Sequence, residues 1–135
     1  METRIEVKFI QEDKFQIKTS PSETTLLIDK PKEGYLPQGP NPLELFLSAL
    51  GGCIGVYAKI YLLRHQIVFK ELNIKVAAEL SKESPIQLIN LRVNVYTDAQ
   101  LGEKRDIFLR FIKNCPVHNT ILNTKEINIA NNKIS

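Results

Sequence analysis

The sequence predicts an α+β fold in which short antiparallel strands precede one long helix, and further strands and a second helical segment follow it. Two observations support this prediction. Apolar and polar residues alternate over 4–9 and again over 88–97, which is typical of strands with one buried face. Between these segments, residues 45–58 contain no charged side chain, and a run of that length is typical of a buried helix. The 135 residues, 43% of them hydrophobic and 24% charged, suit a single folded domain over 1–135.

The N-terminal third predicts an antiparallel meander of three strands. The strand over 4–9 has an apolar face that we expect to be half-buried, formed by Ile5, Val7 and Phe9. A polar turn at 11–13 separates it from a second strand around 15–17, and a third candidate follows at 24–28. Turns this short join neighbouring strands in antiparallel order.

A rigid loop and a strong helix start come next. Segment 31–42 holds four prolines and two glycines, which disfavours both a helix and a central strand. Asn41 is a favoured N-cap, Pro42 suits the first helical position, and Glu44 completes a capping-box arrangement. We therefore predict that the long helix begins here and continues to about His65.

The C-terminal half predicts a second set of strands and a helical segment. Strands are expected at 72–80 and 88–97, because apolar and polar residues alternate there. A helical period of apolar residues covers 102–114. A Cys-Pro pair then begins a short helix over 115–122, and a last strand is expected at 126–130.

Charge and length disfavour two classes of function. The formal net charge is only +3 and the basic residues are scattered, which argues against a nucleic-acid-binding surface. The charge-free run of fourteen residues is shorter than the roughly 20 that a membrane-spanning helix needs. The N-terminal residues mix charged and apolar side chains, unlike a secretory signal. We expect a cytoplasmic protein whose thiols are kept reduced.

Cys53 lies in the middle of the long helix, beside three glycines. A cysteine among apolar neighbours is by default a core residue. Gly51 and Gly52 weaken that interpretation, because they leave the thiol less crowded. Each glycine, Gly55 included, costs about 1 kcal/mol relative to alanine, so we expect another helix or backbone to approach closely.

Cys115 precedes Pro116 and therefore occupies the expected N-cap of a new helix. Backbone N–H groups and the helix dipole stabilise a thiolate at such a position, and Lys113 adds positive potential. A small buried thiol is an equally good interpretation, because reactivity also needs exposure. Cys53 and Cys115 are 62 positions apart, so the sequence alone does not show whether they meet.

The two histidines raise the question of a zinc site, since Cys115 and His118 have the spacing of a ligand pair. Cys53 and His65, however, are separated by about 18 Å and about 120° on one helix. They cannot bind the same ion, and we expect no metal and no other cofactor. His118 is expected to cap the helix, to pack near Cys115 or to assist its ionisation. His65 is expected to end the long helix.

Three segments of the sequence resemble the OsmC/Ohr family, named for the osmotically induced protein C and the organic hydroperoxide resistance protein. These segments are Asn41-Pro42-Leu43-Glu44-Leu45-Phe46, Leu50-Gly51-Gly52-Cys53 and Asn114-Cys115-Pro116-Val117-His118. The family shows one cysteine in a helix that begins with Asn-Pro and a second in a later Cys-Pro-Val/Ile segment. The order of the elements fits the family across nearly the whole chain.

The resemblance implies an OsmC-like protomer that is stable as an intertwined homodimer, with two long central helices packed together. It also implies a thiol peroxidase that reduces organic hydroperoxides during oxidative stress, with activity like that of a peroxiredoxin. Cys53 matches the peroxidatic cysteine of the family and Cys115 the resolving one. A dithiol reductant, of the lipoyl type in the best-described branch, would reset the pair. Neither nucleic acid nor a membrane is implied as a partner.

One position departs from the family pattern. Characterised peroxidases of the family have a glutamate ten positions before the first cysteine, where this chain has Leu43. Glu44 falls on the opposite face of a regular helix from Cys53, and we expect it to act as a cap. The alternatives to a peroxidase are a thiol switch, a persulfide carrier or a small-molecule binding protein on the same fold, and a structural dimer whose cysteines are simply buried.

Overall fold

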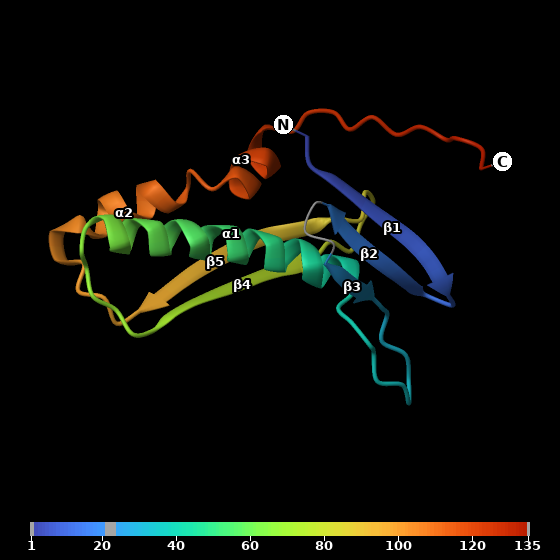
Figure 1. Ribbon diagram of the computed structural model, residues 1–135, viewed down its shortest axis with the longest axis horizontal. Helices are drawn as coiled ribbons and strands as arrows, with labels where there is room; N and C mark the ends of the chain where they lie inside the picture. Colours follow the sequence, from blue (N-terminus) through green and yellow to red (C-terminus); the bar gives the residue numbers. More distant parts are fainter. Residues whose placement is uncertain (1, 21–23, 135) are drawn as a thin grey trace. The chain divides into compact units, whose positions relative to one another are not determined.

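The computed structural model describes residues 2–20 and 24–134 of the chain (Figure 1). The described residues fall into two compact units that divide between Ser48 and Ala49, and each unit is described by itself. The order of elements is three strands, one long helix, two strands and a helical segment, so the predicted α+β class is confirmed. The prediction of a single domain over 1–135 stays a prediction.

The N-terminal unit contains the predicted antiparallel meander. Strand β1 (Arg4–Gln11) pairs with β2 (Lys14–Ser20), which pairs with β3 (Thr25–Ile28). Glu12 takes a positive φ of 51° in the tight turn between the first two strands. The prediction that one face of β1 is half-buried is wrong, because all eight residues of this strand are exposed. Alternation shows that a strand has an apolar face, but it does not show that the same chain covers it.

A buried carboxylate holds the proline-rich loop in place. Asp29 accepts hydrogen bonds from the Tyr35 hydroxyl at 2.7 Å and from the backbone N–H groups of Gln38 at 2.9 Å and Lys30 at 2.8 Å. These donors, Gln38 first, hold the pKa of Asp29 below its usual value. Gly39 lies so close to β3 that a Cβ atom there would come within 1.9 Å of the Leu27 carbonyl oxygen. The loop is therefore tied to β3 at several points.

Helix α1 (Pro42–Arg64) begins and ends where the sequence predicts. The Asn41 side chain accepts a hydrogen bond from the Glu44 backbone N–H at 2.8 Å, and the Glu44 carboxylate accepts one from the Asn41 N–H at 3.0 Å. This reciprocal pair is a capping box, so the predicted role of Glu44 is confirmed. At the other end, the ring of His65 stacks on that of Tyr61 with centroids 4.0 Å apart.

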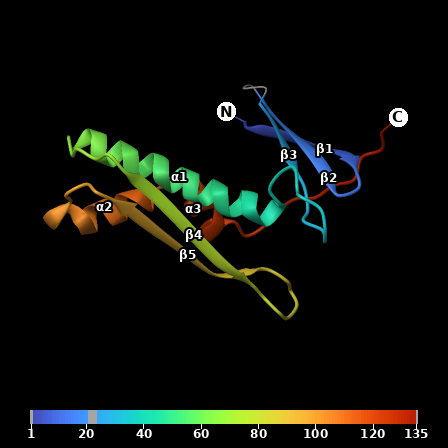
Figure 2. The ribbon, with the colours of Figure 1, turned by 90° about the horizontal axis from the view of Figure 1, so that it is seen from below.

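The C-terminal unit packs α1 against a hairpin and a helical segment (Figure 2). Strands β4 (Leu72–Leu80) and β5 (Leu88–Thr97) pair antiparallel, with Val76 opposite Val93. A 3₁₀ turn, η1 (Gly102–Lys104), leads into α2 (Arg105–Ile112), and α3 (Pro116–Asn123) follows. The fully buried core consists of Leu50, Ile54, Ala58, Tyr61, Leu62, Phe108, Ile112 and Cys115.

Two of the three helix glycines are explained by strand β4. A Cβ atom on Gly51 would lie 2.8 Å from the Val76 Cγ2 atom, and one on Gly55 would lie 3.3 Å from the Ile74 Cγ1 atom. The close approach that we expected from another helix or backbone is therefore made, at these two positions, by β-branched side chains of the same chain. At Gly52 a Cβ atom would meet nothing within 4 Å.

A line of exposed residues follows one side of helix α1 in the C-terminal unit. Gly52, Val56, Lys59 and Leu63 are spaced by four, three and four residues, which places them on one side of the helix, and all four are exposed. We call these residues the open stripe of α1. Val56 is 56% exposed and Leu63 is 60% exposed.

By length and composition α1 could cross a membrane, with a mean hydropathy of 1.6 and a third of its most apolar window buried. The core helices of soluble proteins meet the same criterion.

The predicted last strand is wrong. Residues 124–134 form neither helix nor strand, although Ile127 and Ile129 alternate with polar residues. Ile129 is 91% exposed. A strand is stable only when a neighbouring strand completes its backbone hydrogen bonds, and none of the described strands pairs with this segment.

Candidate redox site

The fold brings the two cysteines together. Cys53 lies on α1, half-buried, and packs against the core cluster that contains Cys115. Cys115 is 0% exposed and lies just before α3. Both are free thiols, and the Cys53 side chain hydrogen-bonds the Cys115 thiol. One half-buried thiol and one buried thiol are thus close enough to interact.

The start of α3 surrounds the Cys115 sulfur with backbone donors. Cys115 is the N-cap residue and Pro116 occupies the first helical position, as the sequence predicts. The His118 N–H donates to the Cys115 Sγ atom across 3.4 Å, and the Val117 N–H also points to it. Unpaired N–H groups at a helix start favour a negative charge. They can therefore stabilise this sulfur as a thiolate.

Burial opposes that effect. Desolvation raises the pKa of the Cys115 thiol, the hydrogen bond with Cys53 raises it further, and the N–H groups of His118 and Val117 lower it. The balance is upward, so Cys115 remains a protonated thiol at neutral pH. Of the two interpretations of Cys115 from the sequence, the buried thiol describes its resting state.

Both histidine rings hydrogen-bond backbone carbonyls. The His118 Nδ1 atom lies 3.0 Å from the Lys113 carbonyl oxygen, so its imidazole hydrogen-bonds that carbonyl and only its backbone N–H contacts Cys115. His65 follows the end of α1, with Nδ1 3.0 Å from the Tyr61 carbonyl oxygen. Over residues 2–20 and 24–134, no three His, Cys, Asp or Glu side chains are close enough to hold a metal ion.

The carboxylate nearest in sequence to the family's glutamate position has another role. Leu43 occupies that position and is exposed. The Glu44 carboxylate is bound to the N–H of Asn41 at the start of α1.

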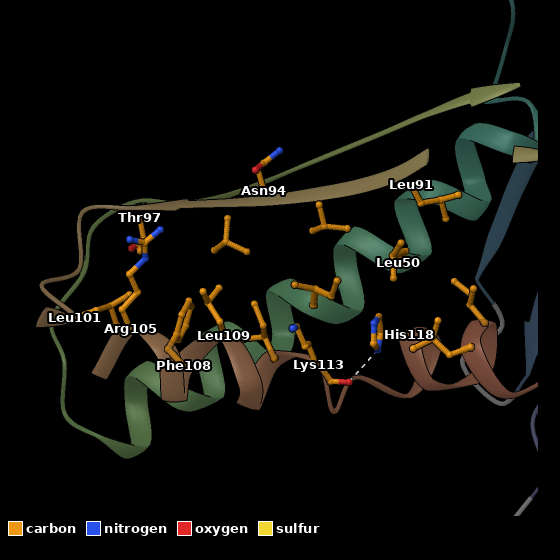
Figure 3. Close-up of a pocket in the computed structure, with 16 residues that line it drawn as sticks. Leu50, Leu91, Asn94, Thr97, Leu101, Arg105, Phe108, Leu109, Lys113 and His118 are labelled. Carbon is orange, nitrogen blue, oxygen red and sulfur yellow. Dashed lines mark hydrogen bonds between the residues drawn. The ribbon is translucent and has the colours of Figure 1, made fainter. Parts of the chain in front are cut away.

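A groove of about 690 Å³ lies in the C-terminal unit, with β5 along one side, α2 and α3 along the other, and α1 as its floor (Figure 3). Its walls are mainly apolar, with Leu50, Ile54 and Val93 among them. Two cations, Arg105 and Lys113, extend from the α2 side toward β5. The salt bridges found among the described residues include neither of them.

Neither cysteine lines this groove. The sequence does not reveal this groove, because periodicity shows that β5 and α2 have apolar faces but not that a space separates these faces.

Comparisons with known proteins agree with this architecture. Residues 33–130 match the family described as OsmC-like protein. An OsmC-like protein from Mycoplasma pneumoniae superimposes with a TM-score of 0.78 at 20% identity, covering 91% of this chain and 89% of that one. The organic hydroperoxide resistance protein OhrB of Bacillus subtilis gives 0.63 at 18% identity, covering 91% and 93%. An organic hydroperoxide resistance protein OsmC from Legionella pneumophila gives 0.66 at 15%, covering 91% and 90%.

At these identities the structural likeness shows the fold, and no curated protein matches the sequence. The family match covers more than half of the chain and includes both cysteine segments. The chain therefore belongs to the OsmC-like family.

Proposed function

We propose that this protein is a thiol-dependent peroxidase that reduces organic hydroperoxides through Cys53 and Cys115. The observation that carries the proposal is the contact between an accessible thiol on α1 and a buried thiol at the start of α3. Two solved structures of the same fold are named as organic hydroperoxide resistance proteins, which supports this choice of substrate.

The chemistry has two steps in this chain. The Cys53 thiolate attacks one oxygen of the hydroperoxide, the O–O bond breaks, and the products are an alcohol and a sulfenic acid on Cys53. The Cys115 sulfur then attacks the sulfenic sulfur, water leaves, and a disulfide joins the two residues. A dithiol, of the lipoyl type as the family resemblance implies, returns two electrons and restores both thiols. The protein's own residues need no cofactor or metal for either step.

The proposal includes a cytoplasmic homodimer. The open stripe of α1 supports the homodimer, because Val56 and Leu63 are both exposed on the same side of the helix. Gly52 lies on the same stripe with free space beside it, so a second helix could approach closely there. Cys53 is adjacent to this stripe, and a partner helix would border the reactive thiol.

The test is hydroperoxide consumption by the reduced protein. Wild type should consume tert-butyl hydroperoxide repeatedly when a dithiol is supplied. Cys53→Ser should abolish consumption, and Cys115→Ser should stop after about one equivalent, because no second sulfur can resolve the sulfenic acid. Equal slow consumption by wild type and Cys53→Ser would disprove the proposal.

The groove favours a second function, the binding of a small molecule with an apolar body and a negative charge. Its volume falls within the range of known ligand sites, and its lining combines apolar walls with Arg105 and Lys113. The probe is 1-anilinonaphthalene-8-sulfonate, followed by fluorescence. Lys113→Gln should weaken binding several-fold. Arg110→Gln, which removes an equal charge from α2 outside the groove, should not, and equal affinities in both variants would exclude this site.

A further inference from the structure

We infer that the reductant opens the Cys53–Cys115 disulfide by attacking the Cys53 sulfur, and that the Cys115 sulfur leaves toward the backbone N–H groups at the start of α3. This inference rests on the proposed function, because it concerns the step that resets the thiol pair. It assigns different roles to the two sulfurs during reduction: Cys53 carries the mixed disulfide, and Cys115 is the leaving group.

Access favours attack at Cys53. A thiolate must reach the sulfur that it attacks, on the side opposite the sulfur that leaves. Cys53 is half-buried, whereas Cys115 is 0% exposed within the core cluster. An external dithiol can therefore approach Cys53 with Cys115 behind it, but the reverse approach is blocked by the core.

The backbone favours departure of Cys115. The His118 N–H lies 3.4 Å from the Cys115 Sγ atom, and the Val117 N–H also donates to it. Cys53 lies well inside α1, where each backbone N–H is already bonded to a carbonyl one turn earlier. Only the Cys115 sulfur has free amides to receive the charge that develops when the S–S bond breaks.

Burial makes these amides necessary. In the reduced protein, desolvation is the largest effect that raises the pKa of Cys115, and the Cys53 hydrogen bond is the next. The second effect weakens once Cys53 is held in a mixed disulfide, because an uncharged disulfide sulfur is a poorer acceptor for the Cys115 S–H group than a thiolate. The first remains, and a thiolate in an apolar environment leaves slowly unless hydrogen bonds stabilise it.

The electrons and atoms of the exchange balance as follows. The reductant thiolate forms a bond to the Cys53 sulfur, the Sγ–Sγ bond breaks, and the pair of electrons goes to the Cys115 sulfur, which then takes up a proton. The second thiol of the reductant loses its proton and attacks the reductant sulfur of the mixed disulfide. Cys53 leaves as a thiolate, and the reductant becomes a cyclic disulfide.

The experiment identifies the sulfur that is attacked. The full-length protein is oxidised with tert-butyl hydroperoxide and, in parallel, with diamide, and the disulfide is then exposed briefly to N-acetylcysteine. This monothiol cannot complete the second exchange within the same molecule. The reaction is stopped with N-ethylmaleimide, and the peptides are analysed by mass spectrometry. We expect N-acetylcysteine on Cys53 and N-ethylmaleimide on Cys115 in at least a tenfold excess, whereas a majority of the reverse product would overturn the inference.

A pair of variants tests the amides separately from access. His118→Pro removes the N–H that donates to Cys115 and should slow the opening of the disulfide about tenfold. His118→Ala keeps that N–H, and its disulfide should open at the wild-type rate. The imidazole that this variant lacks hydrogen-bonds the Lys113 carbonyl rather than the sulfur. Equal rates in His118→Pro and wild type would overturn the role of the amides. If His118→Pro does not fold, the mapping of the adduct in wild type still decides the inference.

The two oxidants separate this inference from the proposed function. If diamide forms the disulfide and the hydroperoxide does not, the peroxidase proposal fails, and the direction of reduction is still measured on the diamide-oxidised protein. If neither oxidant joins Cys53 to Cys115, both are wrong.

Discussion

Cys53 and Cys115 are the same residue type in contact with one another, yet their environments differ. Cys53 is half-buried on α1 and Cys115 is fully buried, with its pKa raised by burial and by the Cys53 hydrogen bond. We predict that iodoacetamide at pH 7.5 modifies Cys53 at least ten times faster than Cys115. A thiol whose pKa is raised stays protonated to higher pH, so the rate at Cys115 should begin to rise only above the ordinary thiol range.

The measurement is the pH dependence of alkylation at each cysteine, followed by mass spectrometry. Cys53→Ser and Cys115→Ser are the controls that assign each rate to one thiol. Equal rates at neutral pH would contradict the prediction, and slow rates at both would favour the alternative in which the cysteines are simply buried.

The core contains the buried hydroxyl group of Tyr61. Its ring packs against Phe108 and Phe111, and its hydroxyl is buried with no hydrogen-bond partner over the described part of the chain. Removing an unsatisfied buried hydroxyl costs nothing in hydrogen bonding. We therefore predict that Tyr61→Phe leaves the free energy of unfolding unchanged or raises it by up to about 1 kcal/mol.

The control is Tyr35→Phe, since the Tyr35 hydroxyl donates to the buried carboxylate of Asp29. That variant should be less stable than wild type in urea denaturation. A larger loss in Tyr61→Phe than in Tyr35→Phe would show that the Tyr61 hydroxyl has a partner in solution.

At the scale of elements, the close packing of α1 on β4 can be tested with two adjacent glycines. Alanine is favoured over glycine in a helix by about 1 kcal/mol. At Gly51 the new methyl group would meet Val76 Cγ2 at 2.8 Å, whereas at Gly52 it would meet nothing. We predict that Gly51→Ala lowers the free energy of unfolding by about 1–3 kcal/mol, because overpacking outweighs helix propensity. Gly52→Ala should raise it by about 1 kcal/mol.

Both glycine variants are compared by urea denaturation in a background that carries Val56→Glu, which keeps a second copy away from the open stripe. If Gly51→Ala instead raises the free energy of unfolding, β4 can move away from α1 with little loss of stability.

Elements with strong local signals could be predicted from the sequence. The strands expected at 72–80 and 88–97 coincide with β4 and β5, and α1 ends one residue before His65. Each of these signals comes from neighbouring residues: alternation, a cap or a proline. The strand expected at 126–130 failed because a strand also needs a partner, which local alternation does not supply.

The candidate site was predictable only in part, because local patterns in the sequence do not show which distant segments pack together. The N-cap position of Cys115 follows from Pro116, which the sequence shows directly. The contact between Cys53 and Cys115 depends on how α1 packs against the segment that contains α2 and α3, and no local pattern specifies that packing. For His118 the sequence predicts a cap, packing near Cys115 or help with its ionisation. Its backbone N–H does donate to the Cys115 sulfur, whereas its imidazole hydrogen-bonds the Lys113 carbonyl.

At the scale of the whole molecule, the open stripe of α1 predicts association. Val56 and Leu63 are both more than half exposed on the same side of α1, and exposed apolar side chains that lie together mark interaction sites. We predict that the wild type sediments as a dimer and that Val56→Glu dissociates it, because a buried unpaired carboxylate opposes packing. Analytical ultracentrifugation at micromolar concentrations measures the change.

The matched control is Ile107→Glu, which places the same charge on an exposed position of α2 outside the stripe. That variant should remain dimeric. If wild type is a monomer, or if both variants dissociate equally, the stripe is not the contact surface.

Because Cys53 and Cys115 meet within a single chain, closing the disulfide is a unimolecular event. Its rate should not change when the protein is diluted, and the oxidised chain should migrate in non-reducing electrophoresis as a monomer, slightly faster than the reduced chain because a loop of 62 positions is closed. In the proposed homodimer, each protomer would then hold its own complete thiol pair, and the two pairs would be oxidised and reduced independently.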